Sequence, residues 1–252
     1  MRGAAAEIVT DTEPDLSAHP VPQGLDRNLL PALPAPRLLL ADMDSTLIEQ
    51  ECLDEVADLA GCGARVAAIT EAAMRGELDF EGALAERVAL LTRQPASLLD
   101  RALAERITLT PGAMVMARTL RAAGTTLVLV SGGFTVFTGA IAGALGFDRH
   151  HGNALEIENG VLTGRVRPPI LGRAAKAERL AAERAALALR PDQTAALGDG
   201  ANDLDMLRAT PLGIAYHAKP VVAAAAPLRL DHGDLAAVPA LFGLDPLGGP
   251  SG

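Results

Sequence analysis

Short apolar runs alternate with longer amphipathic segments over most of the chain. Residues 38–41, 125–130 and 194–197 have the length and apolar character of strands buried on both faces, which is typical of parallel sheets. Apolar residues with helical spacing fill the segments 111–123, 134–145 and 172–189. This alternation predicts an α/β fold built on a doubly wound parallel sheet.

Two further elements complete the expected sheet. The alternating runs 154–158 and 161–164 flank Asn159-Gly160, a dipeptide that strongly favours a tight β-hairpin. Residues 213–216 form another short apolar run and predict one more strand. Pro111 is expected at the first position of its helix, where its missing N–H costs nothing.

Between the first two strands, residues 48–108 contain helical patterns without a convincing strand. Helices are expected near 51–60 and 64–74, and another should open at Pro95 and run to about residue 106. An amphipathic stripe, with Asp79 as candidate N-cap, is formed by Phe80, Leu84, Val88 and Leu91. We expect this insertion to be a four-helix cap over the strand ends.

The two ends of the chain differ from the centre. Residues 1–36 are acidic and then proline-rich, which predicts a mobile arm or linker, and 245–252 read as a disordered tail. The predicted organisation is therefore an α/β core, made of residues 37–47 and 109–244, that carries the helical cap.

Composition excludes several classes of protein. A net charge of −9 over 252 residues argues against a nucleic-acid backbone as partner. No apolar run approaches the roughly 20 residues needed to span a bilayer, and the first residues lack the order of a secretory signal. The only cysteines are Cys52 and Cys62, too few for a disulfide framework, so a cytoplasmic location is expected.

Polar residues follow three of the expected strands. Asp42 and Asp44 come directly after residues 38–41, and because they are two apart, both carboxylates leave an extended chain on one side. The other two runs are followed by Ser131, Gly132, Asp199, Asn202 and Asp203. Since parallel strands bind ligands at their carboxyl ends, we expect these side chains to share one site.

Four carboxylates in one site would repel one another strongly unless a cation lay among them. Oxygen ligands without His or Cys favour Mg2+. Ser131 precedes two glycines and a helix start, where a hydroxyl and free N–H groups can bind an anion. Lys176, one of 2 lysines beside 20 arginines, is expected to add a compact positive charge.

The ordered set of motifs resembles that of the haloacid-dehalogenase-like phosphohydrolases, from about residue 38 to 244. The motifs are Asp42-x-Asp44-Ser45-Thr46, Ser131-Gly132, Lys176 and Gly198-Asp199-Gly200-x-Asn202-Asp203. The resemblance implies a capped, doubly wound sheet, with Asp42 as nucleophile and Asp44 as general acid and base. It also implies Mg2+ held by Asp42, the Asp44 carbonyl and Asp199, with Asp203 in support. Phosphate would be bound by Ser131, Lys176 and Asn202.

Within that superfamily, the chain is similar to the members that hydrolyse O-phospho-L-serine. Positions that resemble their serine-recognition set are occupied by Glu51, Met74, Phe80, Arg87 and Gly132. Arg87 could bind the substrate carboxylate through two hydrogen bonds, and Glu51 could bind its ammonium. The resemblance implies hydrolysis of phosphoserine through an aspartyl-phosphate, as the last step of serine biosynthesis.

Two alternatives stay open. An acceptor alcohol such as homoserine could replace water at the same intermediate, which would make the chain a phosphotransferase. A phospho-accepting signalling domain also uses Asp, Mg2+ and Lys. Asp44 separates the signalling reading from an enzyme, because a signalling domain needs no acid beside its acceptor aspartate.

Overall fold

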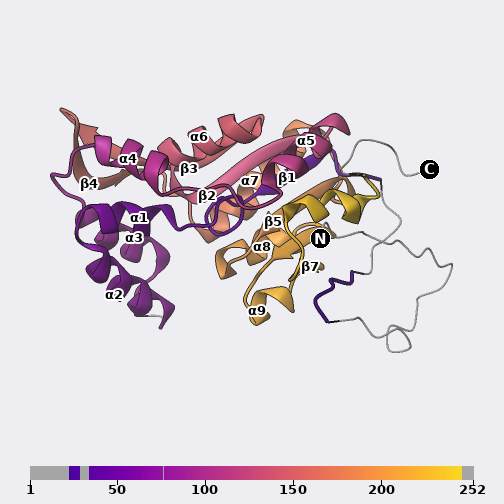
Figure 1. Ribbon diagram of the computed structural model, residues 1–252, viewed down its shortest axis with the longest axis horizontal. Coiled ribbons are helices and arrows are strands. Elements are labelled where there is room, and N and C mark those ends of the chain that lie inside the picture. The colour runs from indigo at the N-terminus through magenta and orange to yellow at the C-terminus, as the bar shows by residue number, and fades with distance from the viewer. Residues whose placement is uncertain (1–22, 29–33, 76, 246–252) are drawn as a thin grey trace.

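The computed structural model describes residues 23–28, 34–75 and 77–245, except for the side chain of Met74. Its centre is a seven-stranded sheet in the order β4-β3-β2-β1-β5-β6-β7 (Figure 1). The strands are β1 Leu38–Ala41, β2 Thr126–Phe134, β3 Arg149–Glu158, β4 Val161–Arg167, β5 Thr194–Gly198, β6 Leu212–Tyr216 and β7 Leu228–Leu230. All neighbours pair in parallel except β3 and β4, which form the predicted hairpin. The predicted α/β fold with a mostly parallel sheet is confirmed.

Both faces of the sheet are covered. In β1, Leu39 and Ala41 belong to one hydrophobic cluster and Leu38 and Leu40 to another, since successive side chains of a strand point to opposite faces. The helices on the two faces are α5 Ala113–Ala122, α6 Thr135–Leu145, α7 Arg173–Ala186 and α8 Leu204–Arg208. Residues of α5 and α6 join the first cluster, and residues of α7 and α8 the second. This double cover explains the uninterrupted apolar runs of the central strands.

The remaining elements of the sheet domain are short. They are η1 Pro191–Gln193, η2 Ala201–Asp203, α9 Pro220–Ala223, η3 Leu235–Ala237 and η4 Pro239–Phe242. Within the residues that the structure describes, every helix is too short or too polar to reach across a lipid bilayer.

Four helices lie along the chain between β1 and α5 and gather at one end of the molecule (Figure 1). They are α1 Cys52–Leu59, α2 Gly63–Met74, α3 Phe80–Ala89 and α4 Ser97–Glu105, called the α1–α4 segment below. Leu84, Val88 and Leu91 are buried in the first hydrophobic cluster. Asp79 accepts a hydrogen bond from the Gly82 N–H at the start of α3, so Asp79 as the N-cap of this helix and the buried part of the stripe are confirmed.

The β3–β4 hairpin is bonded to the chain between α3 and α4. The Arg93 N–H donates to the Leu162 carbonyl at 2.9 Å, and the Leu162 N–H donates to the Gln94 carbonyl at 2.8 Å. The Ala96 N–H donates to the Gly160 carbonyl at 2.8 Å. The α1–α4 segment is therefore attached to the sheet through the hairpin, in addition to the two chain crossings that enter and leave it.

Two predicted helix starts are wrong. The helix expected from Pro111 begins at Ala113, because Gly112 is its N-cap and has a left-handed φ of 82°, which a helical residue cannot have. The helix expected from Pro95 begins at Ser97, because Pro95 pairs with β4 in an isolated bridge. A long-range contact is present in both cases, since the Leu235 N–H donates to the Pro111 carbonyl at 3.1 Å, and it overrides the local preference of proline for a helix start.

Strand β2 is longer than the apolar run predicted. The run suggested an end before Ser131, but the strand continues through two glycines to Phe134. Phe134 pairs with Asn153 of β3 after an irregularity that follows Val130, so pairing extends the strand beyond its apolar part. Gly132 and Gly133 therefore lie within a strand rather than in a loop.

Residues 23–28 lie against the edge strand β7. The Asn28 side chain bonds to the backbone of Arg229 much as a neighbouring strand would, because Nδ2 donates to the carbonyl and Oδ1 accepts from the N–H, both at 2.8 Å. This segment belongs to the predicted mobile arm. The rest of that arm up to residue 33, namely 1–22 and 29–33, lies outside the described residues, as do residues 246–252 of the predicted tail.

Asp26→Ala should lower the free energy of unfolding by about 1–2 kcal/mol, since hydrogen bonds to a charged acceptor are lost. The Asp26 carboxylate accepts from the backbone N–H groups of Asp231, His232 and Gly233. Urea unfolding measures the loss. Leu25→Ala is the matched control, because the exposed Leu25 side chain should contribute less than about 0.5 kcal/mol. Equal losses in the two variants would contradict a stabilising role for Asp26.

Candidate active site

Three neighbouring strands end at the same edge of the sheet. β1 lies between β2 and β5 and pairs in parallel with both. Asp42 and Asp44 follow β1, Ser131 lies late in β2, and Asp199 follows β5. The parallel topology thus brings the three predicted polar clusters to one place, and the contacts among them define the site.

Lys176 joins two of the acids. Its Nζ lies 2.6 Å from Asp42 Oδ2 and 2.7 Å from Asp203 Oδ1, and its side chain is 1% exposed. The buried residues of α7 are Lys176, Leu180 and Glu183, at helical spacing, so the face that packs on the sheet also delivers the lysine. An ammonium is tolerated at this depth because two carboxylates balance its charge.

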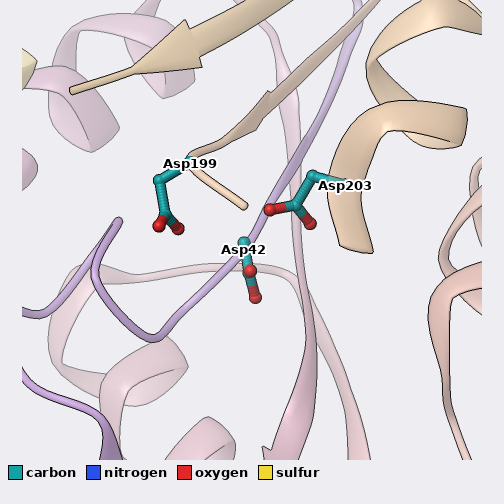
Figure 2. A group of neighbouring side chains, drawn as sticks. All are labelled: Asp42, Asp199 and Asp203. Carbon is teal, nitrogen blue, oxygen red and sulfur yellow. The ribbon is translucent and has the colours of Figure 1, made fainter. Parts of the chain in front are cut away.

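Asp42, Asp199 and Asp203 could together hold a metal ion. One carboxylate oxygen from each lies within 4.8 Å of the others. Figure 2 shows the three side chains close together. The Thr46 hydroxyl donates to Asp199 Oδ1 at 3.0 Å, and the Gly200 N–H donates to Asp203 Oδ2 at 3.0 Å. These bonds orient two of the three carboxylates.

The acids of the site outnumber its cation. Burial, followed by the charge of Asp203, raises the pKa of Asp42, and Lys176 opposes this rise. Burial disfavours the Lys176 ammonium, but Asp42 and Asp203 outweigh it and raise the pKa of Lys176. Burial and the charge of Asp203 raise the pKa of Asp199 to about 6. The excess negative charge and the oxygen-only donors suit a hard divalent cation.

Asp44 is held by a donor on each carboxylate oxygen. The Cys52 N–H donates to Oδ1 at 3.0 Å, and the Ser131 hydroxyl donates to Oδ2 at 3.2 Å. Burial raises the pKa of Asp44, while the bonds from Cys52 and Ser131 lower it. A positioned carboxyl with a raised pKa is suited to giving up and regaining a proton.

Ser131 is buried between Asp44 and the following glycines. Its hydroxyl accepts from the Gly133 N–H at 2.8 Å. Gly133 has no room for a side chain, because a Cβ there would lie 2.8 Å from Asp44 Oδ2. Asn202 is half-buried in η2, directly before Asp203, which is the last residue of this short helix.

The α1–α4 segment contributes charged residues near the site. Glu51 accepts a hydrogen bond from the Ser45 hydroxyl at 2.8 Å. The residue as a whole is exposed, yet burial of its carboxylate, followed by the charge of Asp44, raises the pKa of Glu51 to about 7. Arg87 is half-buried, and burial lowers the pKa of its guanidinium, an effect that the charges of Asp54 and Glu51 oppose only in part.

The apolar members of the predicted recognition set are only partly placed. Phe80, at the start of α3, is half-buried, and its ring lies over Gly132, where a Cβ would come within 3.1 Å of Phe80 Cζ. The side chain of Met74 lies outside the described residues, so its role stays a prediction.

Two residues of the site had no predicted role. Thr46 lies inside the first motif, and this position could have indicated that its hydroxyl contacts the site. Asn153 is a buried amide in β3, where polar side chains need partners. The sequence did not reveal that those partners are the carbonyl of Gly132 and the backbone of Leu171, near the start of α7.

Comparisons with known proteins agree with this geometry. A family model described as haloacid dehalogenase-like hydrolase matches residues 39–208. The chain is 52% identical over 192 residues to the phosphoserine phosphatase of Streptomyces coelicolor, a match that covers 76% of this chain and 47% of that relative. It is 46% identical over 211 residues to the phosphoserine phosphatase of Albidiferax ferrireducens, covering 82% of this chain and 89% of that relative.

The chain therefore spans about half the length of the Streptomyces relative and most of the Albidiferax one. Among solved structures, a phospho-aspartyl intermediate analogue of phosphoserine phosphatase matches with a TM-score of 0.75 and 37% identity. That match covers 81% of this chain and 97% of the other.

Lys176→Met should lower the free energy of unfolding by about 3–5 kcal/mol in EDTA, because it leaves buried carboxylates without their cation. Arg173→Met is the matched control on the same helix. Its ion pair with Asp205 is exposed, with 49% and 43% of the side chains accessible, and should contribute at most about 1 kcal/mol. Urea unfolding measures the free energy lost in each variant. Similar losses would show that the buried ion pairs of Lys176 stabilise the protein no more than an exposed pair does.

Proposed function

This chain belongs to the haloacid dehalogenase-like hydrolases, and on that basis we propose that it hydrolyses O-phospho-L-serine to L-serine and phosphate. The observation that carries the proposal is the environment of Asp42, which has Lys176 at 2.6 Å and a second acid, Asp44, two residues further on. The phosphoserine phosphatases that the chain resembles support the choice of substrate.

Asp42 is the nucleophile in this scheme. The Met43 N–H donates to Asp42 Oδ1 at 2.7 Å and Lys176 contacts Oδ2, so the carboxylate is oriented before substrate arrives. One of its oxygens attacks phosphorus as the bond from phosphorus to the serine oxygen breaks. Lys176, the Ser131 hydroxyl and the Asn202 amide are the groups that stabilise the phosphoryl oxygens.

Asp44 moves the protons of both half-reactions. As the serine oxygen leaves, protonated Asp44 donates to it. A water molecule then gives its proton to Asp44 and attacks phosphorus, breaking the bond to Asp42 and releasing phosphate. The Cys52 N–H on Oδ1 holds the carboxyl in place for both transfers, while the Ser131 hydroxyl, which donates to Oδ2 in this structure, turns to the phosphoryl group when substrate binds.

Mg2+ is the ion that we assign to the acidic cluster. The residues that would hold it are Asp42, Asp199 and, through its main-chain carbonyl, Asp44, with Asp203 in support through its bond to Lys176. Mg2+ prefers oxygen ligands and keeps some of its waters, which suits a site with few protein donors. When bound, it neutralises negative charge on the phosphoryl group.

The α1–α4 segment, within residues 48–108, is the proposed cap that reads the amino acid. Arg87 binds the substrate carboxylate through two hydrogen bonds and Glu51 binds the ammonium, both charge-assisted contacts. Phe80, Met74 and Gly132 surround the rest of the serine. The electrostatic influence of Glu51 on Arg87 supports their placement in one region.

Asp44→Asn should slow steady-state hydrolysis by about 10²–10⁴-fold while leaving Asp42 able to accept phosphate. Mass spectrometry after mixing with phosphoserine and Mg2+ should therefore find a phosphoryl adduct on Asp42. Asp42→Asn should also be inactive but should carry no adduct, because it lacks the nucleophile. Omitting Mg2+ in EDTA should leave the Asp44 variant unmodified. Hydrolysis at the unmodified rate by Asp44→Asn would refute the scheme.

The pH profile of kcat/KM for phosphoserine should fall as the pH drops through about 7, the value to which the pKa of Glu51 is raised. Below that pH the carboxyl is neutral and cannot pair with the substrate ammonium. The profile, measured from about pH 5 to pH 9, reports the free enzyme. Glu51→Gln should lower kcat/KM and remove this step. A step that persists unchanged in the variant would assign it to another group.

A further inference from the structure

A left-handed backbone is not the reason for glycine at positions 132 and 172. Neither is among the glycines with positive φ, and Gly172 has φ −108° and ψ −161°. Both nevertheless face one aromatic ring. A Cβ on Gly132 would lie 3.1 Å from Cζ of Phe80, and a Cβ on Gly172 would lie 3.1 Å from Cδ1 of Phe80. The ring therefore occupies space that two side chains would otherwise need.

The side chain of Asn153 links the backbone of Gly132 to that of Leu171, the residue before Gly172. Its Nδ2 donates to the Gly132 carbonyl at 2.8 Å and to the Leu171 carbonyl at 3.1 Å. Its Oδ1 accepts from the Leu171 N–H at 2.7 Å, and the residue is 1% exposed. A buried amide bonded in this way fixes the separation of the two backbones that it joins.

From this arrangement we propose that Asn153 is a positioning residue. It holds Gly132 and Gly172 as a seat for the ring of Phe80, called the glycine seat below. Seating of the ring sets how closely α3 approaches the phosphate-binding end of the sheet. The inference rests on the proposed function, since it concerns the closure of the cap over phosphoserine.

The glycine seat lies next to the reacting groups on both sides. Gly132 follows Ser131 directly, and Gly172 is the N-cap of α7, with its carbonyl accepting from the Lys176 N–H at 3.3 Å. On the other side of the contact, Arg87 follows Phe80 by seven residues, about two helical turns along α3. Displacement of the ring should therefore move Arg87 away from the substrate carboxylate.

A double-mutant cycle tests the contact. Gly172→Ala is compatible with the backbone but places a methyl group against Phe80, and should raise KM for phosphoserine by about tenfold with a smaller change in kcat. In a Phe80→Leu background, where the ring is gone, the same substitution should raise KM by less than about twofold. Gly143→Ala on α6, whose Cβ would meet no atom within 4 Å, is the control.

The same double-mutant cycle can be measured as free energies of unfolding, which needs no substrate. It therefore tests the glycine seat separately from the proposed hydrolysis of phosphoserine. Coupling in unfolding without any phosphoserine hydrolysis by the unmodified protein would refute the proposed function and leave the contact established. Equal effects of Gly172→Ala in both backgrounds, in KM and in unfolding, would overturn the glycine seat.

Asn153→Asp tests the positioning role directly. The substitution keeps an acceptor for the Leu171 N–H but sets a carboxylate oxygen against the carbonyls of Gly132 and Leu171. The preference in kcat/KM for phosphoserine over p-nitrophenyl phosphate, which has no amino acid to read, should fall about tenfold. A loss of stability with that preference unchanged would reduce Asn153 to a structural residue. If the variant does not fold, the Gly172–Phe80 cycle decides.

Discussion

The buried contacts of Lys176 with Asp42 and Asp203 constrain the rest of the molecule. The three residues come from α7, from the end of β1 and from η2, so one ammonium joins three segments that are distant in sequence. A charge at this depth is tolerated only with both partners in place, which means that the packing of α7 and the arrangement of the acids depend on each other. The same contacts orient Asp42, the proposed nucleophile, so the fold and the proposed chemistry depend on one set of bonds.

Much of the fold could be predicted because its strands are buried on both faces. The run Leu38–Ala41 is apolar at every position, and each side chain does find a hydrophobic cluster. The errors arose where a distant segment decides the local structure. The Leu235 N–H bonds to the Pro111 carbonyl beside the left-handed Gly112. Pro95 pairs with the hairpin, and Phe134 extends β2 by pairing with β3. Local propensity contains no information about such partners.

The motifs located the acids and the lysine, because parallel strands bring the residues at their carboxyl ends to one edge of the sheet. The supporting bonds could not be predicted in the same way. The contact from Thr46 to Asp199 spans 153 residues, and that from Asn153 to Gly132 spans 21. Which backbone or side chain lies opposite a buried polar group depends on the packed structure, and a sequence shows only that a partner must exist.

The bonds between the β3–β4 hairpin and the chain from Arg93 to Ala96 affect how the α1–α4 segment can open. A segment joined to a sheet by its entry and exit alone could swing on those two crossings like a flap on a hinge. Here the hairpin is a third attachment, continuous with the sheet through the pairing of β3 with β2. Any movement of the segment away from the sheet must therefore change the twist of the β3–β4 hairpin. In a two-stranded ribbon this change is spread over the whole length of the strands. We therefore expect the hairpin to limit the α1–α4 segment to small openings.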